Sequence, residues 1–360
     1  MTRIGDLDTP ALLIDLDIME RNLRRVADYA AAHNLRLRPH TKTHKSIFLA
    51  RKQLAAGAAG LTVAKTGEAE VMLGAEPRDL LVAYPVIGEA KVRRLGSLAG
   101  ITRITVAIDS LFGARQLSQA AEAAGVRFGI LVETEVGLGR VGVAPGDALE
   151  LSRAVSQLPN LDWRGITFYP GHIKDQDEDK IAELSDKTGR LTDEFARAGL
   201  RPEIVSGGST PLLYHSHEIA GLNEIRPGTY IFNDLNTVAS GACTLDDCAA
   251  SVLTTVVSTA QPGRMIVDGG SKTFSSDRLS SGGPGHGRVM EAPGALFHKM
   301  NEEHGFVDLA RAERTFQIGE KVRIIPNHVC VAVNLHEYVY GVRKGAVEEV
   351  WNVEARGKLQ

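Results

Sequence analysis

Two short segments of the chain carry residues that could perform chemistry. In residues 38–45, Lys42 follows a short apolar run, and a lysine amine held in a desolvated site can attack a carbonyl carbon to form a Schiff base. In residues 326–330, His328 and Cys330 are two positions apart. In an extended chain their side chains point to the same face and could share one metal ion. The two segments together predict carbonyl-type covalent catalysis assisted by a Lewis acid.

Each segment also has a simpler interpretation. Lys42 could be a surface lysine in a polar loop, and Lys45 competes with it as the nucleophile, although Lys42 is nearer to the apolar run. A single His-x-Cys pair does not complete a metal site, so water, substrate oxygen atoms or His304 would have to supply further ligands. An imidazole with a thiolate favours Zn²⁺, whereas a carboxylate in place of Cys330 would suit Mg²⁺ or Mn²⁺ better.

The composition is that of an ordinary globular protein. Hydrophobic residues make up 43% and charged residues 24% of the 360 positions, and the net charge of −3 gives no reason to expect nucleic acid or an anionic membrane as a partner. No apolar run approaches the roughly 20 residues that span a bilayer, and the first residues lack the pattern of a signal peptide. Three cysteines cannot all pair. We therefore expect a soluble cytoplasmic protein.

The first two-thirds of the chain alternates short apolar runs with helical patterns. Asp17 is placed to cap the first helix, and residues 111–124 and 174–198 show further helical patterns. Such alternation is typical of parallel strands joined by helical crossovers, and eight strands can close a (β/α)₈ TIM barrel with catalytic groups at the carboxyl ends of its strands. An open doubly wound sheet is the alternative. The eight predicted strands are residues 35–37, 60–64, 80–83, 104–108, 128–133, 165–169, 203–205 and 229–232.

The last third of the chain has a different rhythm. Its apolar runs are separated by turns rich in Gly, Pro and Ser rather than by helices, which predicts a mainly antiparallel β domain. The predicted strands are residues 251–258, 264–267, 321–325 and 346–353, and residues 11–15 could join them. We expect the barrel to comprise residues 18–238. The β domain would then comprise residues 1–17 and 239–360 and would carry the metal site.

Three further motifs follow predicted strands. Residues 206–210 (Ser-Gly-Gly-Ser-Thr) could bind a phosphate group through backbone N–H groups and hydroxyls, with residues 226–230 completing the site, or could form a plain turn. The glycine-rich residues 137–142 could aim Arg140 into the mouth of the barrel. Tyr169 could support a cofactor ring, although a packing role is equally ordinary for a tyrosine at this position.

Together, these segments resemble the fold-type III pyridoxal-phosphate enzymes of the D-threonine aldolase and D-serine dehydratase family, which have an alanine racemase-like barrel. The similar segments keep the family's order and are residues 8–11, 38–42, 206–210, 303–305, 326–330 and 355–357. The resemblance covers nearly the whole chain. It implies a pyridoxal-phosphate-binding barrel with a C-terminal β domain, commonly assembled as a homodimer.

The resemblance also implies roles for individual residues. Lys42 would hold pyridoxal 5′-phosphate and, with His328, would be catalytic. His328 and Cys330 would bind a divalent metal such as Zn²⁺, Mn²⁺ or Mg²⁺ beside the β-hydroxyl of the substrate. Arg140 would approach the phenolic oxygen of the cofactor, and Tyr169 would lie near its pyridine ring. The other cofactor-binding residues implied are His40, Ser206, Gly207, Gly208, Ser209, Thr210, Gly228 and Tyr230.

Two reactions within this family compete. Residues 224–234 and 334–337 look closer to the aldolases, which cleave D-β-hydroxy-α-amino acids to glycine and an aldehyde, so we expect a D-threonine aldolase. The run His328-Val329-Cys330 looks more like the dehydratases, which convert D-serine or D-threo-3-hydroxyaspartate to a keto acid and ammonia. A racemase is a third possibility, although it has no evident use for a metal pair. A non-catalytic cofactor carrier is the alternative from another class, but such carriers are usually a barrel alone.

Overall fold

The chain folds into two compact units, and the computed structural model describes residues 2–360. The barrel unit consists of Val26–Lys42, Ile47–Gly228 and Gly357–Gln360. The β unit consists of residues 2–25, Thr43–Ser46 and Thr229–Arg356. The chain therefore passes from one unit into the other directly after Lys42 and directly after Gly228. The domain boundaries expected from the sequence stay a prediction.

The barrel unit is built on a parallel sheet. Among the described residues this sheet has eight strands, in the order β2-β9-β8-β7-β6-β5-β4-β3. A bridge between His40 and Thr62, with the N–H of Thr41 donating to the carbonyl of Thr62 at 2.8 Å, joins the two outermost strands. The (β/α)₈ barrel is thereby confirmed, and the open sheet is excluded. The strands are β2 (Arg36–Leu37), β3 (Leu61–Val63), β4 (Asp79–Val82), β5 (Arg103–Ile108), β6 (Phe128–Glu133), β7 (Leu161–Thr167), β8 (Ile204–Gly207) and β9 (Glu224–Ile225).

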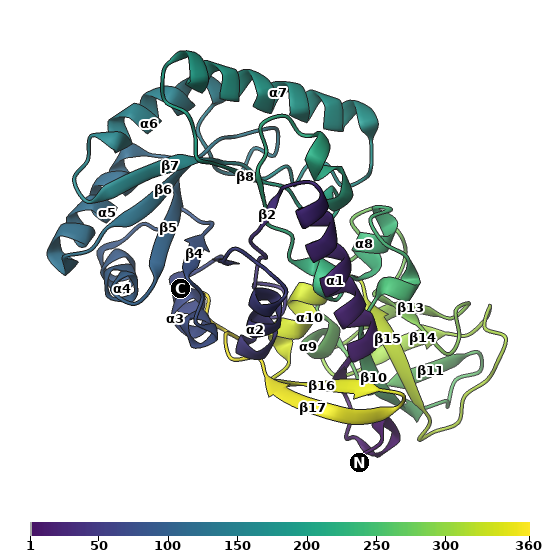
Figure 1. The fold of residues 1–360 in the computed structure, drawn as a ribbon. Helices are drawn as coiled ribbons and strands as arrows, with labels where there is room; N and C mark the ends of the chain where they lie inside the picture. The colour runs from purple at the N-terminus through teal and green to yellow at the C-terminus, as the bar shows by residue number, and fades with distance from the viewer. Residues whose placement is uncertain (1) are drawn as a thin grey trace. The chain divides into compact units, whose positions relative to one another are not determined.

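Helices cover the outside of this sheet. All residues of β4 and β6 are buried, as expected for parallel strands that are enclosed on both faces. Figure 1 shows the long helices on the outer side of the strands, and the hydroxyl of Ser110 and the carboxylate of Asp177 cap two of them. The helices of the barrel unit are α2 (Ile47–Ala55), α3 (Thr66–Met72), α4 (Glu89–Ala99), α5 (Leu111–Ala124), α6 (Ala148–Ser156) and α7 (Glu178–Arg197).

The structure corrects two local predictions. Helix α1 (Leu16–Ala32) begins before Asp17, and the carboxylate of Asp15 accepts the N–H of Ile18 at 3.0 Å, so Asp17 is not the cap. The predicted eighth strand at residues 229–232 is also wrong, because Thr229–Ile231 forms a short 3₁₀ helix and β9 is the eighth strand. A charged residue, Glu224, hides β9 from a search for apolar runs. Pro227 has no N–H with which to continue the strand pairing.

The β unit contains a mixed, mostly antiparallel sheet. Nine strands of this sheet lie among residues 2–360, and β1 pairs antiparallel with β10 and parallel with β16, so the predicted strand at residues 11–15 does join it. Three short helices, α8 (Leu235–Ala239), α9 (Ser271–Phe274) and α10 (Val329–Leu335), lie in the same unit. The strands are β1 (Ala11–Asp15), β10 (Ala250–Ser258), β11 (Arg264–Val267), β12 (Gly287–Val289), β13 (Leu296–Met300), β14 (Gly305–Asp308), β15 (Lys321–Pro326), β16 (Tyr338–Arg343) and β17 (Ala346–Asn352).

None of the helices described in residues 2–360 is both long enough and apolar enough to cross a membrane. The three cysteines, Cys243, Cys248 and Cys330, are free.

Candidate active site

Lys42 lies at the mouth of the barrel close to two other predicted residues. Its backbone N–H donates to Nδ1 of His40 at 3.3 Å, which ties the lysine to the bridge that closes the sheet. Its Nζ lies 5.8 Å from the ring centroid of Tyr169, which follows β7. The guanidinium carbon of Arg140 lies 5.0 Å from the same centroid. The structure therefore brings Lys42 and Arg140 together at the ring of Tyr169.

The position of the Tyr169 ring depends on a glycine. A Cβ atom added to Gly171 would lie 2.3 Å from Cε1 of Tyr169, far inside van der Waals contact. Any other residue at position 171 would push the ring away from its present place. The segment Tyr169-Pro170-Gly171 thus holds the aromatic ring where Lys42 and Arg140 meet it.

The loop after β8 forms a buried cradle for an anion. Residues 204–210 are all buried, and Gly208 adopts φ +85°, a conformation that suits glycine. The Oγ atom of Ser209 is buried and has no hydrogen-bond partner within residues 2–360. A buried hydroxyl without a partner is costly unless a ligand supplies one. The donor set of this loop therefore fits the phosphate group of a cofactor.

The two lysines of the first segment have different surroundings. The amine of Lys45 is buried in the β unit and donates to Oδ1 of Asn334 at 2.9 Å. Lys42 is only partly buried and faces an aromatic ring in the barrel unit. The structure thus favours Lys42 over Lys45 as the reactive amine. Two other predicted cofactor residues fall in different units. Gly228 is the last residue of the segment Ile47–Gly228 of the barrel unit, and the buried Tyr230 belongs to the β unit.

Two buried charges lie at the mouth of the barrel; the sequence analysis included Arg226 only as part of residues 226–230, and it missed Glu133. Arg226 donates from Nη1 to Oγ of Ser206 at 2.6 Å and from Nη2 to the carbonyl of Phe168 at 3.0 Å, so it links the ends of β7 and β8. Burial lowers the pKa of Arg226. Burial likewise raises the pKa of Glu133, the last residue of β6. A charged residue within or just after an apolar strand is the signal that could have revealed both.

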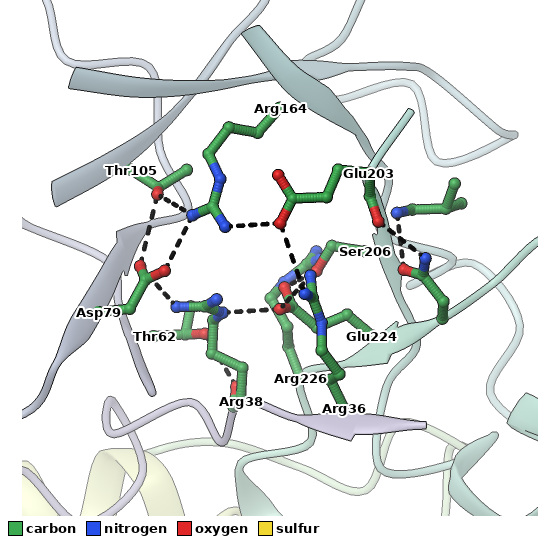
Figure 2. A network of polar contacts seen from close by, with 12 residues as sticks. Arg36, Arg38, Thr62, Asp79, Thr105, Arg164, Glu203, Ser206, Glu224 and Arg226 are labelled. Carbon is green, nitrogen blue, oxygen red and sulfur yellow. Dashed lines mark hydrogen bonds and ion pairs between the residues drawn. The ribbon is translucent and has the colours of Figure 1, made fainter. Parts of the chain in front are cut away.

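Charged side chains also fill the interior of the barrel, where branched apolar residues are usual. Arg38 forms ion pairs with Asp79 at 2.9 Å and with Glu224 at 3.0 Å, and Arg164 forms them with Asp79 at 2.8 Å and Glu203 at 2.9 Å (Figure 2). Arg38 and Glu224 have almost no exposed surface. The contacts of Arg38 are ion pairs without the directions of good hydrogen bonds.

The β unit places His328 and Cys330 differently from the sequence expectation. His328 is extended, but Val329 begins α10, so Cys330 lies in the first turn of a helix and the assumed extended chain is wrong. The cause is Asp234, whose Oδ2 accepts the N–H of Val329 at 2.9 Å while its Oδ1 caps α8. Burial raises the pKa of Asp234.

The two side chains are neighbours all the same. A hydrogen bond to Cys330 raises the pKa of His328 to about 9, with a further contribution from Asp277. Nδ1 of His328 lies 2.6 Å from Oδ2 of Asp277, and Sγ of Cys330 lies 3.2 Å from Oγ1 of Thr43. Asp277 and Thr43 were not predicted, since nothing in the sequence connects them with the pair.

The metal chemistry of this pair is incomplete in the chain alone. No group of three or more His, Cys, Asp or Glu side chains within residues 2–360 is arranged to hold a metal ion, so His304 does not complete a site with them. His328 and Cys330 provide two ligands of the types that Zn²⁺ takes, and a catalytic site also leaves positions for water or substrate. The two donors therefore fit a cation whose other positions are taken by water or substrate.

The chain matches two known protein-family models. A family model described as the N-terminal domain of alanine racemase matches residues 14–235, which is more than half of the chain. The chain belongs to the alanine racemase-like family. A second family model, described as a putative serine dehydratase domain, matches residues 249–342. Membership of the alanine racemase-like family implies pyridoxal phosphate as the cofactor, and the cradle around Ser209 fits its phosphate group.

Several members of this family resemble the chain over nearly its whole length. The 3-hydroxy-D-aspartate aldolase of Paracoccus denitrificans is 36% identical over 98% of this chain and 93% of its own. The crystal structure of D-threonine aldolase from Filomicrobium marinum has a TM-score of 0.92 and 34% identity, and covers 99% of this chain and 98% of its own. D-threo-3-hydroxyaspartate dehydratase from Delftia sp. HT23 has a TM-score of 0.89 and 30% identity, and covers 98% of this chain and 99% of its own. These relatives are lyases by name, which supports an enzyme of the aldolase and dehydratase group.

Proposed function

We propose that this alanine racemase-like enzyme is a pyridoxal-phosphate-dependent D-threonine aldolase, which cleaves D-β-hydroxy-α-amino acids to glycine and an aldehyde. The observation that carries the proposal is the grouping of Lys42, Arg140 and Tyr169 in a barrel that also holds the buried, unpaired hydroxyl of Ser209. Of the three proteins compared above, the two with the higher identity are aldolases.

The residues of the barrel unit would bind and orient the cofactor. Lys42 would be the catalytic amine that holds the cofactor, and the ring of Tyr169, against which Arg140 lies, would support it. Pyridoxal phosphate, when bound, draws electrons away from Cα of the substrate and so makes cleavage of the Cα–Cβ bond possible. The phosphate would lie in the loop after β8. The residues assigned to the cofactor beside Lys42, Arg140 and Tyr169 are His40, Gly207, Gly208, Ser209, Thr210, Gly228 and Tyr230, and Ser206 would serve it indirectly by anchoring this loop.

In the β unit, His328 and Cys330 would bind a divalent cation, Zn²⁺, Mn²⁺ or Mg²⁺. A bound cation would make the β-hydroxyl of the substrate more acidic. Asp277 would orient the imidazole, and Thr43 would hold the thiol. A chelator should therefore stop turnover while the absorbance of the bound cofactor stays largely intact. Equal activity with and without the chelator would remove His328 and Cys330 from the mechanism.

A dehydratase that acts on D-serine or D-threo-3-hydroxyaspartate is the second candidate. The observation that favours it is the match of residues 249–342, which contain His328 and Cys330, to the putative serine dehydratase domain. In a dehydratase the cation would help the hydroxyl group to leave, whereas in an aldolase the same oxygen is kept in the aldehyde product.

Product analysis with D-threonine and D-serine separates the two reactions. The aldolase should release acetaldehyde and glycine from D-threonine, with the metal content of the same sample determined. Formation of 2-oxobutanoate and ammonia from D-threonine, or of pyruvate from D-serine, without glycine would reject the aldolase in favour of the dehydratase. We further propose that the enzyme acts in the cytoplasm as a homodimer. Light scattering of the purified protein would test the dimer.

A further inference from the structure

One buried carboxylate in the barrel interior connects its charged network with the phosphate cradle. Glu224 on β9 has no exposed surface. Its Oε2 atom pairs with Arg38 at 3.0 Å and with Arg36 at 3.4 Å, and its Oε1 atom accepts the hydroxyl proton of Ser206 at 2.7 Å. Figure 2 shows Glu224 among Arg36, Arg38, Arg226 and Ser206.

The hydroxyl of Ser206 is fully used by these contacts. A serine hydroxyl has one proton to donate, and the proton of Ser206 goes to Glu224. Its oxygen in turn accepts from Nη1 of Arg226 at 2.6 Å. Ser206 therefore has no proton left for a phosphate oxygen, in contrast to Ser209, whose buried hydroxyl lacks a partner within the described residues. Ser206 instead anchors the start of the loop that Ser209 belongs to.

We propose that Glu224 is a positioning residue that holds the phosphate-binding loop and Arg226 in place through the hydroxyl of Ser206. The inference rests on the proposed pyridoxal-phosphate cofactor and not on which lyase reaction follows. Because Oε2 of Glu224 pairs with the arginines while Oε1 accepts from Ser206, only a carboxylate can serve both at once. A glutamine at this position has one oxygen and one NH₂ group, so it must give up either Arg38 or Ser206.

Asp79 offers a matched control for this role. Like Glu224, it is a buried acid that pairs with Arg38, but its second oxygen pairs with Arg164 and not with the phosphate-binding loop. Asp79→Asn therefore removes a comparable buried ion pair without reaching Ser206. Ser206→Ala makes the complementary change, since it cuts the link from Glu224 to the loop and leaves all the charges of the network unaltered.

The test titrates the full-length chain, freed of cofactor, with pyridoxal phosphate and with pyridoxal, and follows the absorbance of each bound form. The quantity compared is the affinity for pyridoxal phosphate divided by the affinity for pyridoxal. Glu224→Gln should lower this ratio by about tenfold or more, as expected for one lost charge-assisted hydrogen bond to the loop. Ser206→Ala should do the same, and Asp79→Asn should leave the ratio near that of the parent protein. General destabilisation of the protein would weaken the binding of both ligands alike and leave the ratio unchanged.

Three results would overturn the inference. An unchanged ratio in Glu224→Gln would do so, as would equal losses in Glu224→Gln and Asp79→Asn. If the ratio falls in Ser206→Ala but not in Glu224→Gln, Glu224 does not act through the loop. Ser206→Ala also keeps the test informative if Glu224→Gln does not fold. A parent protein that binds no pyridoxal phosphate would instead overturn the proposed cofactor itself, and this inference with it.

Discussion

The imidazole of His328 and the carboxylate of Asp277 are joined by a contact of 2.6 Å between Nδ1 and Oδ2. Because Nδ1 is engaged by Asp277, Nε2 is the ring nitrogen on which the proposed cation would bind. Carboxylates in this position commonly orient a metal-binding histidine and raise its basicity. The carboxylate comes from residue 277 and the imidazole from residue 328, so the pairing exists only in the folded β unit.

Asp277→Asn should weaken binding of the divalent cation. Loss of such an orienting carboxylate typically costs about 10- to 100-fold in metal affinity. The affinity is measured by titrating the metal-free protein with Zn²⁺ or Mn²⁺ in a calorimeter. Asp246→Asn, at an exposed position of the same unit, is the control. Equal cation affinity in both variants would mean that Asp277 does not support a metal site.

Lys42→Ala should abolish both turnover and the absorbance of covalently bound pyridoxal phosphate, because it removes the amine that joins the cofactor. Lys45→Ala should keep the absorbance, since its amine is bonded to Asn334 in the β unit. Losing that buried hydrogen bond should cost about 1–3 kcal/mol of stability. Absorbance spectra and thermal unfolding of both variants make the comparison. If Lys45→Ala loses the cofactor and Lys42→Ala keeps it, the assignment of the nucleophile is wrong.

Gly171→Ala should reduce kcat/KM by up to about 100-fold, the loss that a misplacement of about 1 Å can produce. The added methyl group would lie 2.3 Å from Cε1 of Tyr169 and must displace its ring. Gly146→Ala is the matched control, because a Cβ atom at that position would meet nothing within 4 Å. Steady-state kinetics and the cofactor spectrum would reveal the difference. Equal kinetics for the two variants would show that the ring position is not critical.

The charged barrel interior predicts a specific loss of stability in acid. Burial alone would raise the pKa of Asp79, but the guanidinium groups of Arg38 and Arg164 hold the pKa below its usual range. In an unfolded chain an aspartate titrates near about 3.9. Ionised Asp79 therefore stabilises the fold above that pH, and this contribution is lost as the pH falls through the lower pKa of the folded protein.

Asp79→Asn should accordingly destabilise the protein by about 3–5 kcal/mol at pH 7, because Arg38 and Arg164 lose a buried partner. The difference from the parent protein should shrink below about pH 4, where the unfolded aspartate is already protonated. Urea unfolding at a series of pH values measures both quantities. A difference that stays constant down to the lowest pH would contradict the pKa shift of Asp79.

Much of the fold could be predicted because the signals are local. Strands such as β6 are apolar over their whole length, and helices such as α5 carry a recognisable cap at Ser110. Lys42 could be placed beyond β2 for the same reason, since the end of a short apolar run is visible in the sequence. The eighth strand was missed because Glu224 interrupts the apolar pattern, and its charge is tolerated only where Arg38 and Ser206 meet it.

The sequence by itself determined the alternation of strands and helices, the nature of the reactive groups and their order along the chain. Only the tertiary structure decided their partners. Asp234 accepts the N–H of Val329, the first residue of α10, from 95 positions away in the chain, and Asp277 contacts His328 across 51 positions. Hydrogen bonds and ion pairs depend on distances in space, and residues so far apart in the chain are brought within bonding distance only when the surrounding apolar elements pack.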